Sequence, residues 1–166
     1  METFQQHTVS FGCPVRTPCL IPVLHASTPS CVNEPFMVDG QAFHVTCFSL
    51  QNPYGAVITE SVDALDISFP GSKLSAHPLF PNGADIVFVE IENKDLIKAR
   101  LYKKEEGEVG FSKRGACAAF VAASILQKTH KTSAVVEMGG KSCSVEWDGV
   151  DGDVKFTGIS AEAAYE

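Results

Sequence analysis

The sequence lacks the features of a secreted or zinc-binding protein. Its first residues, Met-Glu-Thr-Phe-Gln-Gln, have neither the basic start nor the apolar run of a signal peptide, so we expect a cytoplasmic protein. The six cysteines form no Cys-x-x-Cys pair, which favours free thiols over disulfides in that compartment. No two histidines lie three or four positions apart, so we expect no metal site.

Positive charge is also scarce. Thirteen Lys and Arg face twenty Asp and Glu, and the net charge of −7 argues against a nucleic-acid partner. The cations are concentrated, however: residues 94–131 hold nine of them and only four acids. That segment carries +5 and the remainder −12. The surplus is either a solvated face or a basic patch that binds an anionic partner.

No charged side chain occurs between residues 115 and 126, and Ala dominates this stretch. Ala is the best helix former, and a helix that is apolar on every side must be enclosed by other structure. Ser112 stands where an N-cap hydroxyl would accept a hydrogen bond from a free amide of the first turn. Twelve residues are too few to cross a bilayer, so we expect no membrane span. The pattern predicts a short central helix wrapped by the rest of the chain.

The remaining patterns predict roughly seven short strands and one compact domain. Two pairs of strands form hairpins, one around residues 92–95 and one around Gly139-Gly140. The predicted strands span residues 42–50, 56–59, 85–91, 96–102, 134–138, 142–147 and 154–156. A strongly curved, mostly antiparallel sheet folded about the central helix gives the α+β class.

Other segments are predicted to be turns and loops. Residues 52–55 read as a turn, and 62–67 and 71–76 as short helical turns on either side of a break at Pro70-Gly71. Residues 105–110 read as a loop. Residues 1–40 contain five prolines and are predicted to be an extended segment at the edge of a lobe formed by residues 41–166.

The order of these signatures resembles the C-terminal lobe of diaminopimelate epimerase and related cofactor-independent racemases. The resemblance rests on eight motifs in the right order, together with an entering segment Val-Ser-Phe-Gly-Cys-Pro at 9–14. The motifs are Ser-Leu-Gln-Asn-Pro-Tyr-Gly-Ala-Val-Ile at 49–58, residues 71–81 ending Leu-Phe-Pro, Ala-Asp-Ile-Val-Phe-Val at 84–89, Ala-Arg-Leu-Tyr at 99–102, Gly-Glu at 107–108, Gly-Ala-Cys-Ala at 115–118, the Gly-Gly hairpin at 139–140, and Val-Lys-Phe-Thr-Gly at 154–158.

The resemblance implies two facing lobes, each with a cysteine at the N-terminus of its central helix. One thiolate removes the substrate α-proton and the opposite thiol returns a proton to the other face. The helix N-terminus lowers the pKa of the thiol, and its amides hold the substrate carboxylate. This chemistry requires no cofactor.

The departures from that pattern carry more weight than the match. Ser112-Lys113-Arg114 stands where the family has its cysteine followed by Gly-Thr, and Lys103-Lys104 stands where it has a Glu-Arg pair that grips the substrate. Tyr54 replaces a histidine and Asp85 a substrate-binding asparagine, whereas Asn52 is kept. The other lobe, with its own cysteine, has no counterpart in this sequence.

The remaining cysteines offer no substitute for the missing one. Cys117 lies five residues into the predicted helix, on its buried wall, and we do not expect it to be catalytic. Cys47 and Cys143 alternate within strands and are predicted to be core thiols. The catalytic positions Ser112, Asn52, Tyr54 and Asp85 are therefore interpreted as vestigial.

We expect a non-catalytic binding protein, a pseudoenzyme that regulates or inhibits a partner and that a virus or mobile element could encode. Lys103, Lys104, Lys113 and Arg114 are the predicted anion-binding residues, a basic rim at the old substrate mouth that docks an acidic protein surface or a phosphate-bearing group. The alternative is an isomerase, an amino-acid epimerase half completed by a homodimer partner or a separate chain. A remnant or an engineered fragment is a third hypothesis, although a single change to Ser112 would have left the Gly-Thr in place.

Overall fold

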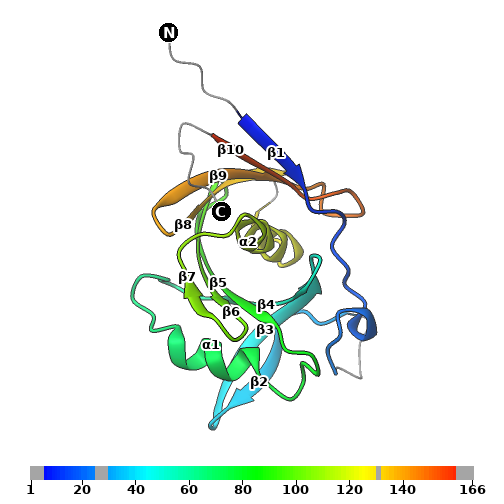
Figure 1. Ribbon diagram of the computed structural model, residues 1–166, viewed down its shortest axis with the longest axis vertical. Coiled ribbons are helices and arrows are strands. Elements are labelled where there is room, and N and C mark those ends of the chain that lie inside the picture. Colours follow the sequence, from blue (N-terminus) through cyan, green and yellow to red (C-terminus); the bar gives the residue numbers. More distant parts are fainter. Residues whose placement is uncertain (1–5, 25–29, 130–131, 160–166) are drawn as a thin grey trace.

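Helix α2 (Lys113–Ile125) lies at the centre of the computed structural model, which describes residues 6–24, 30–129 and 132–159. Every residue from Gly115 to Ala123 is buried, so the helix has no solvent-facing side over these positions. Figure 1 shows α2 enclosed by the curved sheet, with β8 and β9 on one side and β4, β5 and β6 on the other. The central, enclosed helix predicted from the sequence is confirmed.

Within the described ranges, ten strands form a single sheet. The strands are β1 (Gln6–Ser10), β2 (Glu34–Val38), β3 (Gln41–Ser49), β4 (Pro53–Ile58), β5 (Asp85–Asn93), β6 (Leu96–Lys103), β7 (Gly107–Val109), β8 (Ser133–Met138), β9 (Lys141–Glu146) and β10 (Lys155–Ile159). Their spatial order is β1-β10-β9-β8-β6-β5-β4-β3-β2, and β7 pairs with β6. The structure thus confirms the α+β class with a curved, mostly antiparallel sheet.

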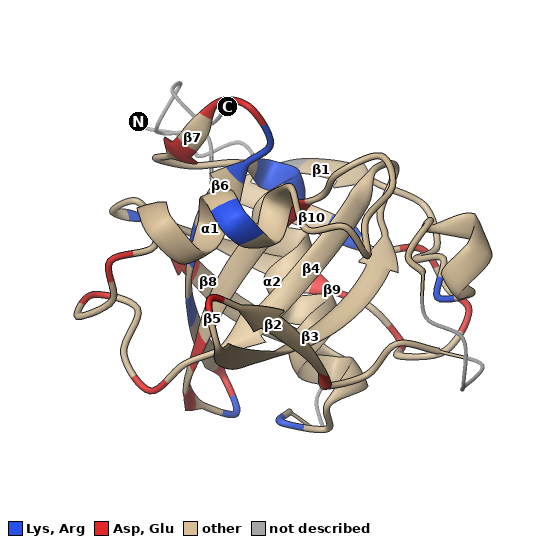
Figure 2. Ribbon diagram, turned by 90° about the horizontal axis from the view of Figure 1, so that it is seen from below, with Lys and Arg blue, Asp and Glu red and all other residues tan. Residues whose placement is uncertain are grey.

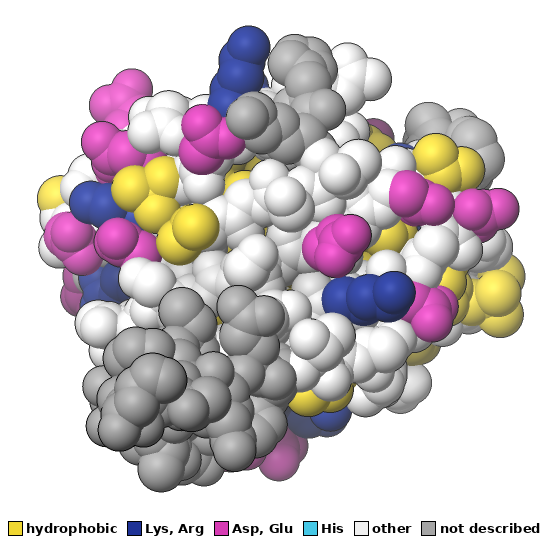
Figure 3. All heavy atoms as spheres, turned by 90° about the horizontal axis from the view of Figure 1, so that it is seen from above, with side chains coloured by type: hydrophobic (Ala, Val, Ile, Leu, Met, Phe, Trp, Pro, Cys, Tyr) yellow, Lys and Arg dark blue, Asp and Glu magenta, His cyan; other side chains and the backbone are white. Residues whose placement is uncertain are grey.

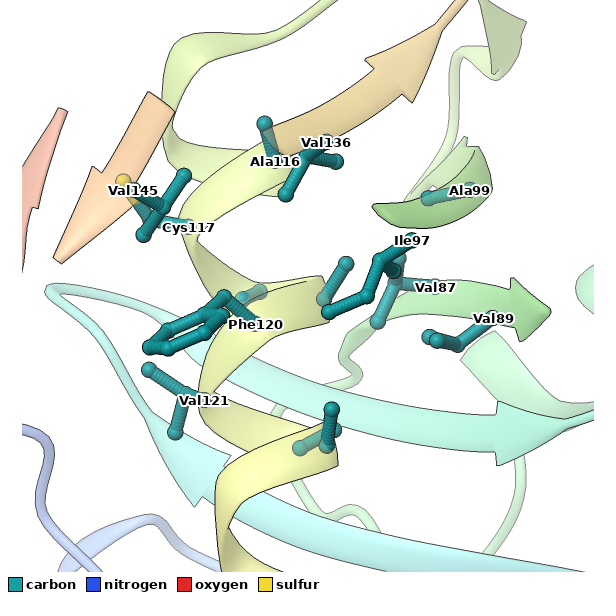
Figure 4. Packing of buried hydrophobic residues seen from close by; sticks show 14 of the residues in the cluster. Val87, Val89, Ile97, Ala99, Ala116, Cys117, Phe120, Val121, Val136 and Val145 are labelled. Carbon is teal, nitrogen blue, oxygen red and sulfur yellow. The ribbon is translucent and has the colours of Figure 1, made fainter. Parts of the chain in front are cut away.

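Two apolar clusters lie on opposite faces of this sheet. The inner cluster surrounds α2 and includes Phe120, Val87 and Val136, which Figure 4 shows on different sides of the helix. The outer cluster, which includes Phe36, Leu74 and Phe88, lies beneath helix α1 (Ser68–Ser75). Strand β6 shows why both clusters form: its odd-numbered residues Ile97 to Leu101 are buried, whereas its even-numbered ones are half-exposed, as the alternation predicted. None of the described helices is long and apolar enough to cross a membrane.

Several local predictions were wrong. Helix α1 runs through Pro70-Gly71, because proline in the first turn of a helix lacks only an amide that has no partner there. Strand β4 begins at Pro53, inside the predicted turn, and the predicted loop 105–110 contains β7. The seven predicted strands are ten, because β1, β2 and β7 were missed. β1 and β2, from the proline-rich segment 1–40, end the sheet at its two edges.

The turn between β8 and β9 lies close to the segment that precedes α2. Its residue Gly139 has a φ of +60°, and a Cβ added there would overlap the carbonyl of Gly110, just before the helix. The next residue, Gly140, has a φ of +82° but nothing within 4 Å of its would-be Cβ. A substitution at either glycine would strain the backbone, but only a substitution at Gly139 would also meet a close neighbour.

We predict that Gly139→Ala destabilises the protein more than Gly140→Ala. Both variants place a side chain on left-handed backbone, at a cost of about 1–2 kcal/mol. Only Gly139→Ala also overlaps the Gly110 carbonyl oxygen, which adds roughly 1–3 kcal/mol. Urea unfolding followed by the fluorescence of the single, buried Trp147 measures both. Equal losses in the two variants would contradict the contact.

Candidate functional site at the N-terminus of helix α2

Ser112 begins the helix as its N-cap. It has extended backbone, and its Oγ accepts a hydrogen bond from the Gly115 amide at 3.0 Å. A Cβ at residue 115 would lie 2.8 Å from Leu101 Cδ2, so a side chain there would force Leu101 to shift. The predicted cap is confirmed, and the Ser112 hydroxyl is committed to holding the first turn together.

A chain of hydrogen bonds runs from Arg114 to β5 beside this helix end. The residues at this end, Ser112, Arg114, Asn52 and Asp85, are called here the mouth. Arg114 Nη1 donates to Asn52 Oδ1 at 3.1 Å, and Asn52 Nδ2 donates to Asp85 Oδ2 at 2.9 Å. The backbone amide of Lys104 donates to the other oxygen, Asp85 Oδ1, at 2.8 Å. Asp85 is 8% exposed. Arg114, Asn52 and Asp85 are therefore linked by hydrogen bonds within the protein.

Strand pairing brings these residues together although they lie far apart in sequence. β4 and β5 are parallel, and Tyr54 pairs directly with Asp85. Asn52 precedes β4 and Arg114 belongs to the first turn of α2. The guanidinium of Arg114 lies 5.6 Å from the ring centre of Phe11, and its Nε is buried with no hydrogen-bond partner among the described residues. The guanidinium of the half-buried Arg114 thus lies against Asn52 and Phe11, and its participation in binding stays a prediction.

Tyr54 lies next to this network, paired with Asp85. It is 1% exposed, and its ring stacks on Phe48 with the ring centres 5.9 Å apart. Burial raises the pKa of Tyr54, and the neighbouring Asp85 raises it further. Its phenol is therefore neutral at physiological pH.

The thiol nearest to this helix end in sequence, Cys117, is sealed in the interior. It is fully buried beside Val145, as Figure 4 shows. Burial raises the pKa of Cys117 well above its usual value, and Cys143 adds to the effect. Cys47 and Cys143 are buried as predicted, and Cys143 Sγ donates to the Val136 carbonyl at 3.7 Å.

The four predicted anion-binding residues point in different directions. Lys103 and Ser112 line a cavity of about 580 Å³ together with Lys141. The Nζ of Lys113 lies 5.9 Å above the ring of Phe156. Lys104 instead reaches across to donate to the Asn82 carbonyl at 2.7 Å. Of the four predicted residues, Arg114 and Lys104 thus bond to groups of the protein itself, which leaves Lys103 and Lys113 as the better candidates for binding an anion. The basic rim stays a prediction.

Acidic residues adjoin these cations. Figure 2 shows acidic segments on β7 and on the turn before it, beside the basic segment that leaves β6. On the face seen from above in Figure 3, basic side chains stand singly among acidic ones. The described surface in these two views therefore carries mixed charge, and the local excess of +5 predicted for residues 94–131 is spread over several elements.

Arg100 is a structural cation that the sequence analysis did not single out. Its Nε and Nη2 each donate to a carboxylate oxygen of Glu108 at 2.7 Å, and its Nη1 donates to the carbonyls of Val62 and Leu65. The hydrogen bonds to Glu108 raise the pKa of Arg100. The sequence placed Arg100 on the polar face of β6. Its partners Glu108, Val62 and Leu65 could not be predicted from sequence spacing.

A comparison with known protein families now identifies the chain's relatives. A family model described as diaminopimelate epimerase matches residues 47–161. The chain belongs to the diaminopimelate epimerase family. The resemblance deduced from the motifs is thereby confirmed.

Individual members of the diaminopimelate epimerase family match almost the whole chain. It is 32% identical over 154 residues to diaminopimelate epimerase 1 of Nostoc sp., covering 92% of this chain and 55% of that protein. It is 33% identical over 150 residues to the diaminopimelate epimerase of Acetivibrio thermocellus, covering 90% and 53%. The chain spans about half the length of the curated relatives it matches.

Among solved structures, a phenazine biosynthesis protein of the PhzF family from Bacillus anthracis is similar over 86% of this chain and 36% of its own, with a TM-score of 0.44 and 14% sequence identity. No three described His, Cys, Asp or Glu residues gather closely enough to hold a metal ion.

We predict that the side chain at position 112 stabilises the protein as a cap. Ser112→Ala removes the acceptor for the Gly115 amide and should cost about 1 kcal/mol, whereas Ser112→Asn keeps an acceptor and should cost a few tenths. Neither variant changes the net charge. Urea unfolding measures both, and an Asn variant as unstable as the Ala variant would show that the hydroxyl does not act as a cap.

Proposed function

We propose that this epimerase-family lobe binds a partner and does not itself move a substrate proton. The observation that carries the proposal is the self-contained mouth, in which Ser112 caps the helix and Arg114, Asn52 and Asp85 bond to one another. A substrate carboxylate at this helix end would have to compete with these internal partners.

The chemistry of the available groups supports a non-catalytic role. Removal of an α-proton needs a base placed at the mouth, and general bases work best when their pKa lies near the operating pH. The resemblance puts Ser112 where relatives carry cysteine, and an alcohol is far too weak an acid to supply the base without an activating partner. Burial raises the pKa of both Tyr54 and Cys117, and Cys117 is out of contact with solvent. Cys117 therefore offers no replacement at this position.

The proposed ligand is an acidic protein surface, bound through Lys103 and Lys113. These cations flank Ser112, and Lys103 and Ser112 share the cavity of about 580 Å³. The N-terminal end of a helix carries partial positive charge, which adds to the attraction for carboxylates. The overall charge of −7 disfavours a nucleic-acid backbone as the ligand. A protein that binds its partner without turnover would act as a regulator or inhibitor, and we propose that it does so in the cytoplasm.

An epimerase half is the second candidate, and membership of the diaminopimelate epimerase family favours it. In that function a separate chain or a second copy of this one would supply the facing lobe and its thiol. The retained Asn52, the enclosed helix and the sheet would then serve as a scaffold for the completed cleft. The two candidates differ in one observable, which is exchange of the substrate α-proton with solvent.

We predict that Lys103→Glu/Lys113→Glu weakens binding of a fluorescent deca-glutamate peptide by about tenfold or more, equivalent to roughly 1.4 kcal/mol. Fluorescence anisotropy at low and at physiological ionic strength measures it, and the affinity should fall with salt. The matched control is Lys94→Glu/Lys128→Glu, which changes the net charge equally at exposed lysines outside the mouth, one of them beyond the C-terminal end of α2. Equal weakening in both double variants would refute the site and leave only a general charge effect.

A further inference from the structure

Two buried cysteines face each other in the outer cluster, away from the mouth. Cys47 lies in β3, and Cys31 lies three residues before β2. Their Sγ atoms are 3.0 Å apart, and the residues are 1% and 0% exposed. The sulfurs would need to approach by about 1 Å more to reach the length of a disulfide bond, roughly 2.05 Å.

The backbone holds the two cysteines in this position. β2 and β3 form an antiparallel hairpin, with Glu34 opposite Val45. Beyond the last pair, the Cys47 amide donates to the Cys31 carbonyl at 2.9 Å, and the Asn33 amide donates to Thr46 Oγ1 at 3.0 Å. The cysteines therefore close the open end of the hairpin, opposite its turn.

The other described thiols are placed differently. Cys13 and Cys19 are exposed, whereas Cys117 and Cys143 are buried in the inner cluster around α2. Within the facing pair, the hydrogen bond between the two thiols lowers the pKa of Cys31, and burial raises the pKa of Cys47.

We propose that Cys31 and Cys47 form a reversible intramolecular disulfide when the protein meets a hydroperoxide. The Cys31 thiolate attacks a peroxide oxygen and becomes a sulfenic acid, and with hydrogen peroxide the displaced hydroxide takes a proton and leaves as water. The Cys47 sulfur then attacks the Cys31 sulfur, the S–S bond forms, and a second water leaves. Two thiols lose two electrons, and one peroxide is reduced to two waters. A small dithiol reverses the reaction by exchange.

The bond would lock an edge of the sheet. β2 is the last strand on its side, so the hairpin it forms with β3 is held by neighbours on one side only. An edge strand opens more readily than a central one, and such an opening gives peroxide access to the buried pair. The disulfide spans residues 31–47 and restricts the unfolded chain over that loop. The proposal is independent of the function proposed for the mouth.

The test uses the full chain with Cys13→Ser and Cys19→Ser, which removes the exposed thiols. The protein is treated with hydrogen peroxide both when folded and during refolding from urea, then alkylated and digested. We expect a mass loss of about 2 Da, a Cys31–Cys47 linked peptide and a thermal midpoint raised by roughly 5–10 °C, all reversed by dithiothreitol.

Two controls make the result decisive. Adding Cys31→Ser or Cys47→Ser should abolish the mass loss and the thermal shift, whereas adding Cys143→Ser should preserve both. The buried Cys117 and Cys143 serve as an internal comparison and should remain thiols. Oxygen addition without a cross-link, a Cys117–Cys143 link, or free thiols at both Cys31 and Cys47 in both arms would each overturn the proposal.

Discussion

Enclosure of the Ala-rich helix α2 is the constraint on which the rest of the structure depends. A helix without a polar face cannot lie on a surface, so the sheet has to curve around it until every residue from Gly115 to Ala123 is buried. Small side chains allow this close approach, as at Gly115, where a Cβ would lie 2.8 Å from Leu101 Cδ2. Once the sides are covered, the ends of the helix are the places where its backbone can meet other polar groups.

The N-terminal end of α2 is the place to which the resemblance assigns the chemistry, and in this chain several of its polar groups bond to one another. The Ser112 hydroxyl holds the Gly115 amide, and the guanidinium of Arg114 turns inward to Asn52, which in turn holds Asp85. The pKa values of Tyr54 and Cys117 move upward because both side chains are buried. Our proposal is that the scaffold of the diaminopimelate epimerase family is kept while the proton-transferring group at its expected position has been lost.

Features set by local pattern could be predicted from the sequence. The α2 helix, its Ser112 cap, the hairpin at Gly139-Gly140 and the alternation along β6 all follow from neighbouring residues, and the motifs revealed the family. Features set by long-range packing could not. Pro70 was read as a break because its place in the first turn depends on where α1 begins. The parallel pairing of β4 with β5, the inward course of Arg114 and the contact of Cys31 with Cys47 join residues distant in sequence, and no spacing rule encodes them.

The most direct test of the central claim is proton exchange at the substrate α-carbon. The chain is incubated in deuterated water with meso- and LL-diaminopimelate, and NMR follows loss of the α-proton signal, with a full-length diaminopimelate epimerase as the positive control. The account predicts no exchange above the buffer rate, because an alcohol occupies the position of the thiol and the nearest cysteine of α2 is sealed inside. Exchange above background that disappears when Cys117 or Ser112 is replaced would contradict it.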